Sequence, residues 1–144
     1  MLESGIYDKE KISVSSIVNE VLTEKHPEDV GAILMFTGIT KKWGFDGKEV
    51  ESIEMESYEK HANDTIKRIC KEVREKYGAA SVQIFHMIGN FKVGENLVLV
   101  IVTSKSRKEA IPALEEAINR YKTEPALWKK EIYTDGSGKW ISHA

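Results

Sequence analysis

A lysine at the end of a predicted helix is the residue of this sequence best placed for chemistry. Lys122 follows Ile118 by four residues, so it projects from the apolar side of its helix. A cation in the last turn is also favoured by the helix dipole. The more frequent role for such a lysine is structural, with its stem packed on the core edge and its ammonium in water. The alternative is a partly desolvated amine with a lowered pKa, suited to anion binding, acid–base chemistry or nucleophilic attack.

Three further cations could join Lys122 in an anion-binding pocket. Lys129 and Glu131 share one face of a predicted strand. The ordinary interpretation of such a pair is an exposed ion pair that contributes little to stability. Arg107 stands near the start of the preceding helix, and Lys41 lies in a glycine-bearing loop directly after an apolar strand. Such loops often carry ligand contacts. The residues alone therefore predict a lysine and arginine pocket for an anionic ligand.

Several other kinds of site are absent from the sequence. The four histidines are scattered without metal-ligand spacing, and the single Cys70 cannot build a cysteine-rich zinc site, so we expect no metal and no cofactor. His86 shares a predicted strand face with Val82 and Ile84, which favours a hydrogen-bonded core histidine. No phosphate-binding glycine motif and no Gly-x-Ser-x-Gly elbow occurs.

Length and composition indicate one domain over residues 1–144 in a soluble, cytoplasmic protein. A net charge of -2, from 21 basic and 23 acidic residues, disfavours a nucleic-acid binder. The longest aliphatic run, at 97–102, is far shorter than the ~20 residues that cross a bilayer, so no membrane partner is expected. The first four residues, Met1 to Ser4, lack the basic and apolar features of a signal peptide.

Hydrophobic periodicity predicts interspersed helices and strands, which favours an α+β fold with an antiparallel or mixed sheet. A long helix over 58–77 carries one apolar stripe and ends at Gly78, and the run at 97–103 is typical of a central strand. Pro112 either sits in the first turn of its helix or kinks it. The remaining predictions are a helix at 15–22, a buried strand at 31–39, strands at 53–56 and 82–88 with a turn at 89–90, a helix at 110–121, and short strands at 128–133 and 139–142.

Several short strings, in a particular order over about residues 31–140, resemble the MoaE family, the large catalytic subunit of molybdopterin synthase. They are Phe36-Thr37-Gly38, Ile53 to Tyr58, His86-Met87-Ile88-Gly89 with Gly94-Glu95, Val102-Thr103-Ser104 before Arg107, Lys122-Thr123, and Trp128 to Glu131. Each string is weak alone, but their order and spacing are specific.

The resemblance implies an α/β hammerhead fold with a small additional C-terminal β element, and a homodimer. It also implies a small ubiquitin-like partner, docked at each end of the dimer, whose C-terminal Gly-Gly carries a thiocarboxylate. Sulfur would pass from two such tails onto precursor Z, a cyclic pyranopterin monophosphate, to form molybdopterin. For the dimer surface, we expect the apolar strand at 97–102 and the aromatic C-terminal segment to contribute.

The resemblance also assigns roles to individual residues. Lys122 matches the catalytic lysine and Lys129 the second pocket lysine, while Lys41 and Arg107 match anion-binding positions, with Arg107 reaching the pocket from the other chain. Ser106 stands where the family has a histidine next to that arginine. The channel for the partner's tail is expected to contain Phe36, Trp128 and Glu131. The serine motivates a second hypothesis, a non-catalytic dimeric module that binds a ubiquitin-like partner's tail.

Overall fold

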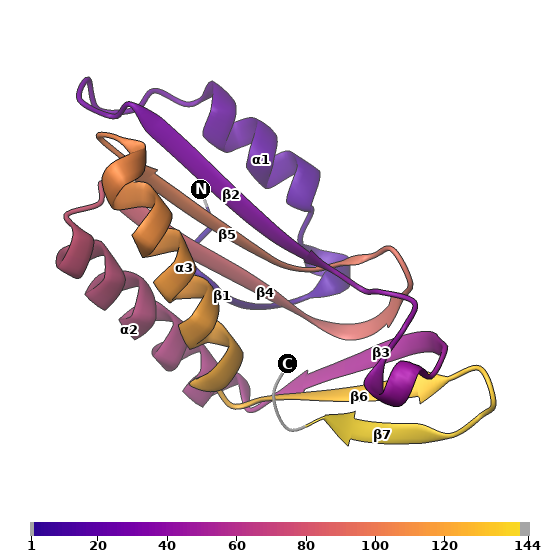
Figure 1. The fold of residues 1–144 in the computed structure, drawn as a ribbon. Helices are drawn as coiled ribbons and strands as arrows, with labels where there is room; N and C mark the ends of the chain where they lie inside the picture. Colours follow the sequence, from indigo (N-terminus) through magenta and orange to yellow (C-terminus); the bar gives the residue numbers. More distant parts are fainter. Residues whose placement is uncertain (1, 142–144) are drawn as a thin grey trace.

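Residues 2–141, the part of the chain that the computed structural model describes, form one sheet of seven strands with three α-helices packed against it (Figure 1). This agrees with the predicted α+β class. Within these residues, no helix is both long and apolar enough to cross a membrane. The elements are β1 (Gly5–Asp8), α1 (Val14–Thr23), β2 (Ala32–Ile39), β3 (Val50–Ser57), α2 (Glu59–Tyr77), β4 (Ser81–Lys92), β5 (Asn96–Ser104), α3 (Arg107–Thr123), β6 (Leu127–Tyr133) and β7 (Gly138–Ile141).

The helices follow the predicted apolar spacing. In α2 the apolar stripe is buried and Gly78 caps the helix with a left-handed φ of 63°, a conformation that glycine adopts without a steric penalty. In α3 the sequence left the effect of Pro112 open, and the structure places this proline in the second turn of a helix that runs unbroken to Thr123. The chain therefore carries Lys122, without interruption, to the far end of α3.

The strands are ordered β2-β5-β4-β3-β6-β7, and all these neighbours are antiparallel; β1 adds to β4 in parallel. The sheet is thus mixed. β4 belongs to both halves, because residues 81–86 pair with β5 and residues 89–92 pair with β3. The strands β3, β6 and β7 form the part that projects beyond the helices (Figure 1).

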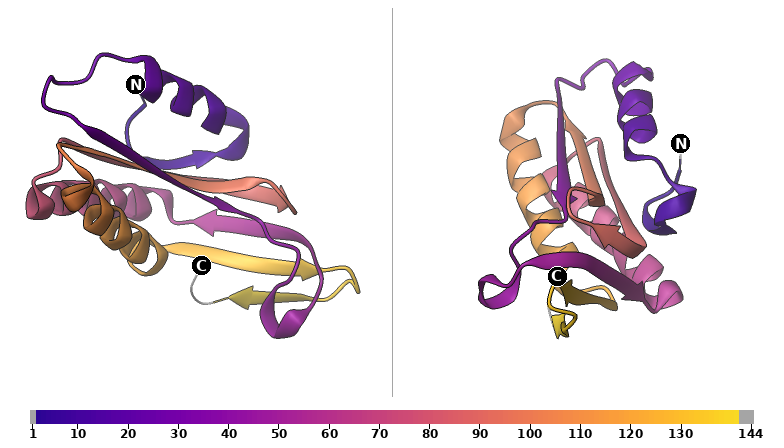
Figure 2. Two further views of the ribbon diagram at one scale, coloured as in Figure 1. Left: turned by 45° about the horizontal axis from the view of Figure 1, so that its top comes forward. Right: turned by 90° about the vertical axis from the view of Figure 1, so that its right-hand side faces the viewer.

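The half of the sheet that contains β2, β5, β1 and the start of β4 is covered on both faces (Figure 2). α2 and α3 pack on the face that carries Val98, Val100 and Val102 of β5, and α1 packs on the face that carries Leu99 and Ile101. Successive residues of a strand point to opposite faces, so one strand supplies both cores. The prediction that 97–103 is a central covered strand is confirmed.

Two predictions about the strands are wrong, and one strand is missing from them. No turn occurs at Gly89-Asn90; β4 continues to Lys92 and the chain reverses at 93–95. Gly89 has a φ of 128°, so its freedom is used inside the strand, where β4 passes from one half of the sheet to the other. β2 is an edge strand and only partly buried, and β1 was not predicted at all.

The expected dimer surface at 97–102 is also wrong. β5 is paired with β2 along one edge and with β4 along the other, and both of its faces are covered. A strand in this position cannot meet a second chain. The free edge of the sheet in this region belongs to β2.

Candidate active site

A cavity of about 320 Å³ lies where the two halves of the sheet meet the last turn of α3. Its walls come from strands β2 to β6 and from α3, which are distant in sequence. The lining combines apolar residues with three lysines, one glutamate, one histidine and one tyrosine: Phe36, Gly38, Ile39, Lys41, Ile53, Met55, His86, Leu97, Val98, Tyr121, Lys122, Lys129 and Glu131.

Three of the four predicted cations line this cavity. Lys41 follows the end of β2, Lys122 lies in the last turn of α3, and Lys129 lies on β6. Lys122 is exposed, as expected for an amine at the mouth of a pocket, whereas Lys129 is partly buried. The loop after β2, the end of α3 and strand β6 thus each bring one lysine to the same cavity.

The environment of Lys129 shows the effect of this clustering. Burial lowers the pKa of Lys129, and the positive charges of Lys41 and Lys122 lower it further, while the negative charge of Glu131 opposes both. Desolvation and like charges disfavour the protonated amine. A bound anion relieves the repulsion, so the cavity is electrostatically suited to phosphate or carboxylate groups.

Glu131 is buried, with 4% of its surface exposed, and it holds the loop after β2 in place. Its carboxylate accepts hydrogen bonds from the backbone N–H of Phe45, at 2.9 Å, and from the hydroxyl of Tyr133, at 2.8 Å. The loop approaches so closely that a Cβ on Gly44 would lie 2.5 Å from Glu131 Oε1. Glu131 lines the cavity and also braces the loop that follows Lys41 and Lys42.

Of the other two residues expected in the tail channel, Phe36 lines the cavity and Trp128 does not. Trp128 is 48% exposed, and its neighbour Lys129 points the opposite way because side chains alternate along a strand. Within one chain, Trp128 therefore lies on the outer face of β6.

Arg107 and Ser106 lie at the other end of α3 from Lys122. Fifteen residues of helix separate the two ends, a span of roughly 22 Å at 1.5 Å per residue. Ser106 caps the helix: its hydroxyl accepts from the N–H of Lys108 at 3.2 Å and donates to Glu109 at 2.6 Å. A single chain does not bring Arg107 to the lysine cavity.

The cavity also contains two polar residues that the sequence analysis did not assign to the site, His86 and Tyr121. His86 is a buried, hydrogen-bonded histidine, as predicted, with Nδ1 3.0 Å from the carbonyl oxygen of Met87. Its ring meets that of Tyr121 edge-on at 5.6 Å. The available sequence signals were the single polar residue on an apolar strand face and the tyrosine directly before Lys122, but neither revealed that the two residues meet.

We expect His86 to make the stability of the fold depend on pH. Burial lowers the pKa of His86 to about 4 from its ordinary 6.5. As the pH falls from 6.5 towards 4, the unfolded chain takes up a proton that the folded chain refuses, so stability decreases by about 3 kcal/mol in total. Urea unfolding at several pH values should show this loss of stability in the wild type and not in His86→Phe. If the stability of both proteins depends on pH in the same way, His86 is not the cause.

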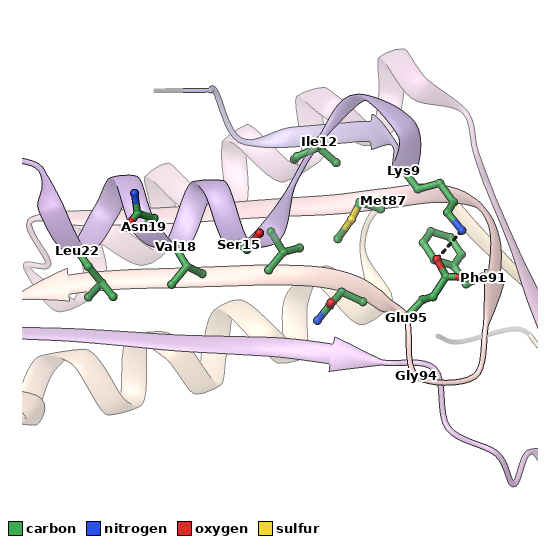
Figure 3. Close-up of a pocket in the computed structure, with 12 residues that line it drawn as sticks. Lys9, Ile12, Ser15, Val18, Asn19, Leu22, Met87, Phe91, Gly94 and Glu95 are labelled. Carbon is green, nitrogen blue, oxygen red and sulfur yellow. Dashed lines mark hydrogen bonds and ion pairs between the residues drawn. The ribbon is translucent and has the colours of Figure 1, made fainter.

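A second, larger groove of about 690 Å³ lies on the opposite side of the sheet, between α1 and the β4–β5 hairpin (Figure 3). Val18 and Leu22 of α1 point into it, and at its far end Lys9 forms an ion pair with Glu95 at 2.7 Å. The amine of Lys9 also lies 4.9 Å from the ring centre of Phe91. No residue predicted for the site lines this groove, and its one cation is already paired.

Comparison with known proteins gives a consistent result. A family model described as MoaE protein matches residues 7–124. The chain is 34% identical over 134 residues to the molybdopterin synthase catalytic subunit of Bos taurus, covering 93% of this chain and 68% of the bovine protein. It is 39% identical over 133 residues to that of Bacillus subtilis (strain 168), covering 92% and 81%.

Solved structures agree with the fold. The crystal structure of molybdopterin synthase from Staphylococcus aureus matches with a TM-score of 0.85 and 33% identity over 99% of both chains. A chain from a complex of subunits 1 and 2 of molybdopterin-converting factor from Helicobacter pylori 26695 matches with a TM-score of 0.66 and 19% identity, covering 96% of this chain and 86% of that one. This second likeness concerns the fold.

Proposed function

The chain belongs to the MoaE family, and on that premise we propose that it transfers sulfur within molybdopterin synthase, from the thiocarboxylate of a small ubiquitin-like partner onto precursor Z. As a catalytic subunit it is an enzyme of molybdenum cofactor biosynthesis.

The meeting of Lys41, Lys122 and Lys129 in one cavity is the observation that carries the proposal. Precursor Z bears a cyclic phosphate, and the tail of the partner ends in an anionic thiocarboxylate. Fixed cations bind both kinds of group through charge-assisted hydrogen bonds. The apolar walls, including Phe36 and Met55, limit water around the partly buried Lys129 and strengthen the attraction there.

The reaction needs stabilisation of the negative charge that develops on the carbonyl oxygen of the partner's tail. The sulfur of the thiocarboxylate attacks a side-chain carbon of precursor Z, and an oxygen substituent of that carbon leaves with the bonding electron pair. Water then attacks the carbonyl carbon of the resulting thioester. That attack gives a tetrahedral oxyanion, which collapses to leave sulfur on the substrate and a carboxylate on the tail. An ammonium group beside the oxyanion lowers the barrier, and Lys122 and Lys129 are the candidates for this role. Two such rounds supply both sulfur atoms.

A second copy of the chain can supply Arg107 through the free edge of β2. The N–H of Gly31, just before β2, bonds to the carbonyl of Ser104, so the start of α3 lies near the start of β2. The end of β2 leads instead to Lys41. An isologous antiparallel pairing of two β2 strands sets the start of one beside the end of the other. Arg107 of the second copy then approaches the lysine cavity of the first.

A conversion assay tests the proposal. The purified chain, a thiocarboxylated partner and precursor Z are mixed, and molybdopterin is measured as its fluorescent oxidation product. We expect product in proportion to the thiocarboxylate consumed. Binding of the partner without any product would favour the second hypothesis, a non-catalytic module that holds the partner's tail.

A further inference from the structure

Two uncharged polar side chains form part of the lysine cavity wall, and the sulfur-transfer step as described does not use them. His86 has 2% and Tyr121 has 4% of its surface exposed, yet both line the cavity. His86 comes from β4 and Tyr121 from α3, so the pair exists only because these elements pack together. Gly38 of β2 lies close to the same point, since a Cβ there would be 4.0 Å from the hydroxyl of Tyr121.

The hydrogen bond of His86 determines which ring nitrogen is free. Nδ1 lies 3.0 Å from the carbonyl oxygen of Met87, and because a carbonyl only accepts, Nδ1 must carry the hydrogen. Nε2 of the neutral ring therefore holds a lone pair. No group among residues 2–141 hydrogen-bonds to Nε2. Burial lowers the pKa of His86 to about 4, so the ring stays neutral near pH 7.

The hydroxyl of Tyr121, like Nε2 of His86, has no hydrogen-bond partner among the described residues. Its ring packs edge-on against His86 with an angle of 62° between the planes. Burial raises the pKa of Tyr121 to about 12, so the hydroxyl keeps its proton. The cavity thus presents one acceptor and one hydroxyl that can donate or accept.

We propose that His86 and Tyr121 recognise the uncharged polar edge of the ligand, while the three lysines hold its anionic groups. The inference rests on the proposed function, and it names the specificity-determining residues of the same site. Neither atom is sealed from the cavity, and a ligand that supplies an N–H to Nε2 and a carbonyl or N–H to the hydroxyl is preferred over one that leaves these atoms without a partner when it fills the cavity. A flat nitrogen heterocycle with amide and amine groups on its edge, as in a pterin, has this chemistry. The apolar residues Phe36, Leu97 and Val98 offer contacts for its ring faces.

Tyr121→Phe and His86→Phe test this inference, because each removes hydrogen-bonding atoms and keeps a ring. We expect each variant to bind precursor Z roughly tenfold more weakly by calorimetry, the effect of losing one buried hydrogen bond. The KM for precursor Z should rise by about the same factor. Affinity for inorganic phosphate, which probes only the lysines, should change by less than about twofold.

Tyr77→Phe is the matched control. The hydroxyl of Tyr77 donates to Glu116 at 2.9 Å, outside the cavity, so its removal should leave the binding of precursor Z unchanged.

If both cavity variants bind precursor Z like the wild type, the inference is wrong and the proposed function stands. If phosphate binding weakens as much as precursor Z binding, the variants have damaged the whole cavity and the inference is also wrong. A wild-type chain that does not bind precursor Z overturns both proposals. Tyr121→Phe decides alone if His86→Phe does not fold.

Discussion

Replacing Lys122 by alanine should lower the rate of molybdopterin formation by a factor on the order of a hundred or more, the loss typical of one well-placed group that stabilises an oxyanion. The chain should remain folded, because Lys122 is exposed and makes no ion pair within residues 2–141. The measurement is the conversion assay under single-turnover conditions, combined with thermal unfolding and with the affinity for the unmodified partner. Both of the latter should stay close to the wild-type values.

Lys130→Ala is the control for this experiment. Lys130 lies on β6 next to Lys129 but on the outer face, where its amine is 5.7 Å from the ring centre of Trp140. The variant removes the same charge from the same region, so a general effect of net charge should appear in both. We expect Lys130→Ala to retain most of the activity. Full activity in Lys122→Ala would mean that this lysine is structural and would favour the non-catalytic hypothesis.

Mixing two inactive variants should restore activity if each site is shared between two chains. Arg107→Ala and Lys122→Ala should each be strongly impaired alone. After the subunits are mixed and re-equilibrated, half of the dimers contain one chain of each kind. Each mixed dimer has one site with Lys122 from one chain and Arg107 from the other, so activity should recover to about a quarter of the wild type. From a starting level near one hundredth, this is a rise of roughly 25-fold.

The reverse mixture is the control. A double variant, with both Arg107→Ala and Lys122→Ala in one chain, is mixed with wild-type chain. The mixed dimers then have one defect in each of their two sites and should add no activity beyond that of the wild-type dimers present. Failure of the two single variants to complement each other would show that Arg107 does not reach the site across a dimer. Light scattering on the same samples should show a dimer of the 16.3 kDa chain.

Local periodicity was enough to predict most elements and the relation of Lys122 to the core. The steps of three and four in α2, with Gly78 after them, describe one apolar stripe and its end, because a helix repeats every 3.6 residues. The alternation of β6 placed Lys129 and Glu131 on the same face, opposite to Lys130, for the same kind of reason. Lys122 was predicted at the edge of the core, and it lies at the cavity mouth.

Strand ends and pairings were less predictable from local patterns. Gly89-Asn90 is a common turn pair, but here the glycine serves a strand that changes partners, from β5 to β3. In the sequence, β2 and β5 are both apolar runs, so their patterns do not show which of them lies at the edge of the sheet. The strand order decides this: β2 has a free edge and β5 is paired on both edges. The expectation that β5 contributes to a dimer surface was therefore wrong.

Local sequence patterns were sufficient to predict the α+β class, the long capped helix and a set of cations suited to an anion. The strings that resemble the MoaE family implied the roles of individual residues. Only the tertiary structure brought Lys41, Lys122 and Lys129 to one cavity, buried Glu131 against the loop after β2, and joined His86 to Tyr121. It also left Arg107 at the far end of α3. The physical reason is that periodicity reports which face a residue takes on its own element. Which faces then meet is decided by packing and strand pairing between segments that lie tens of residues apart.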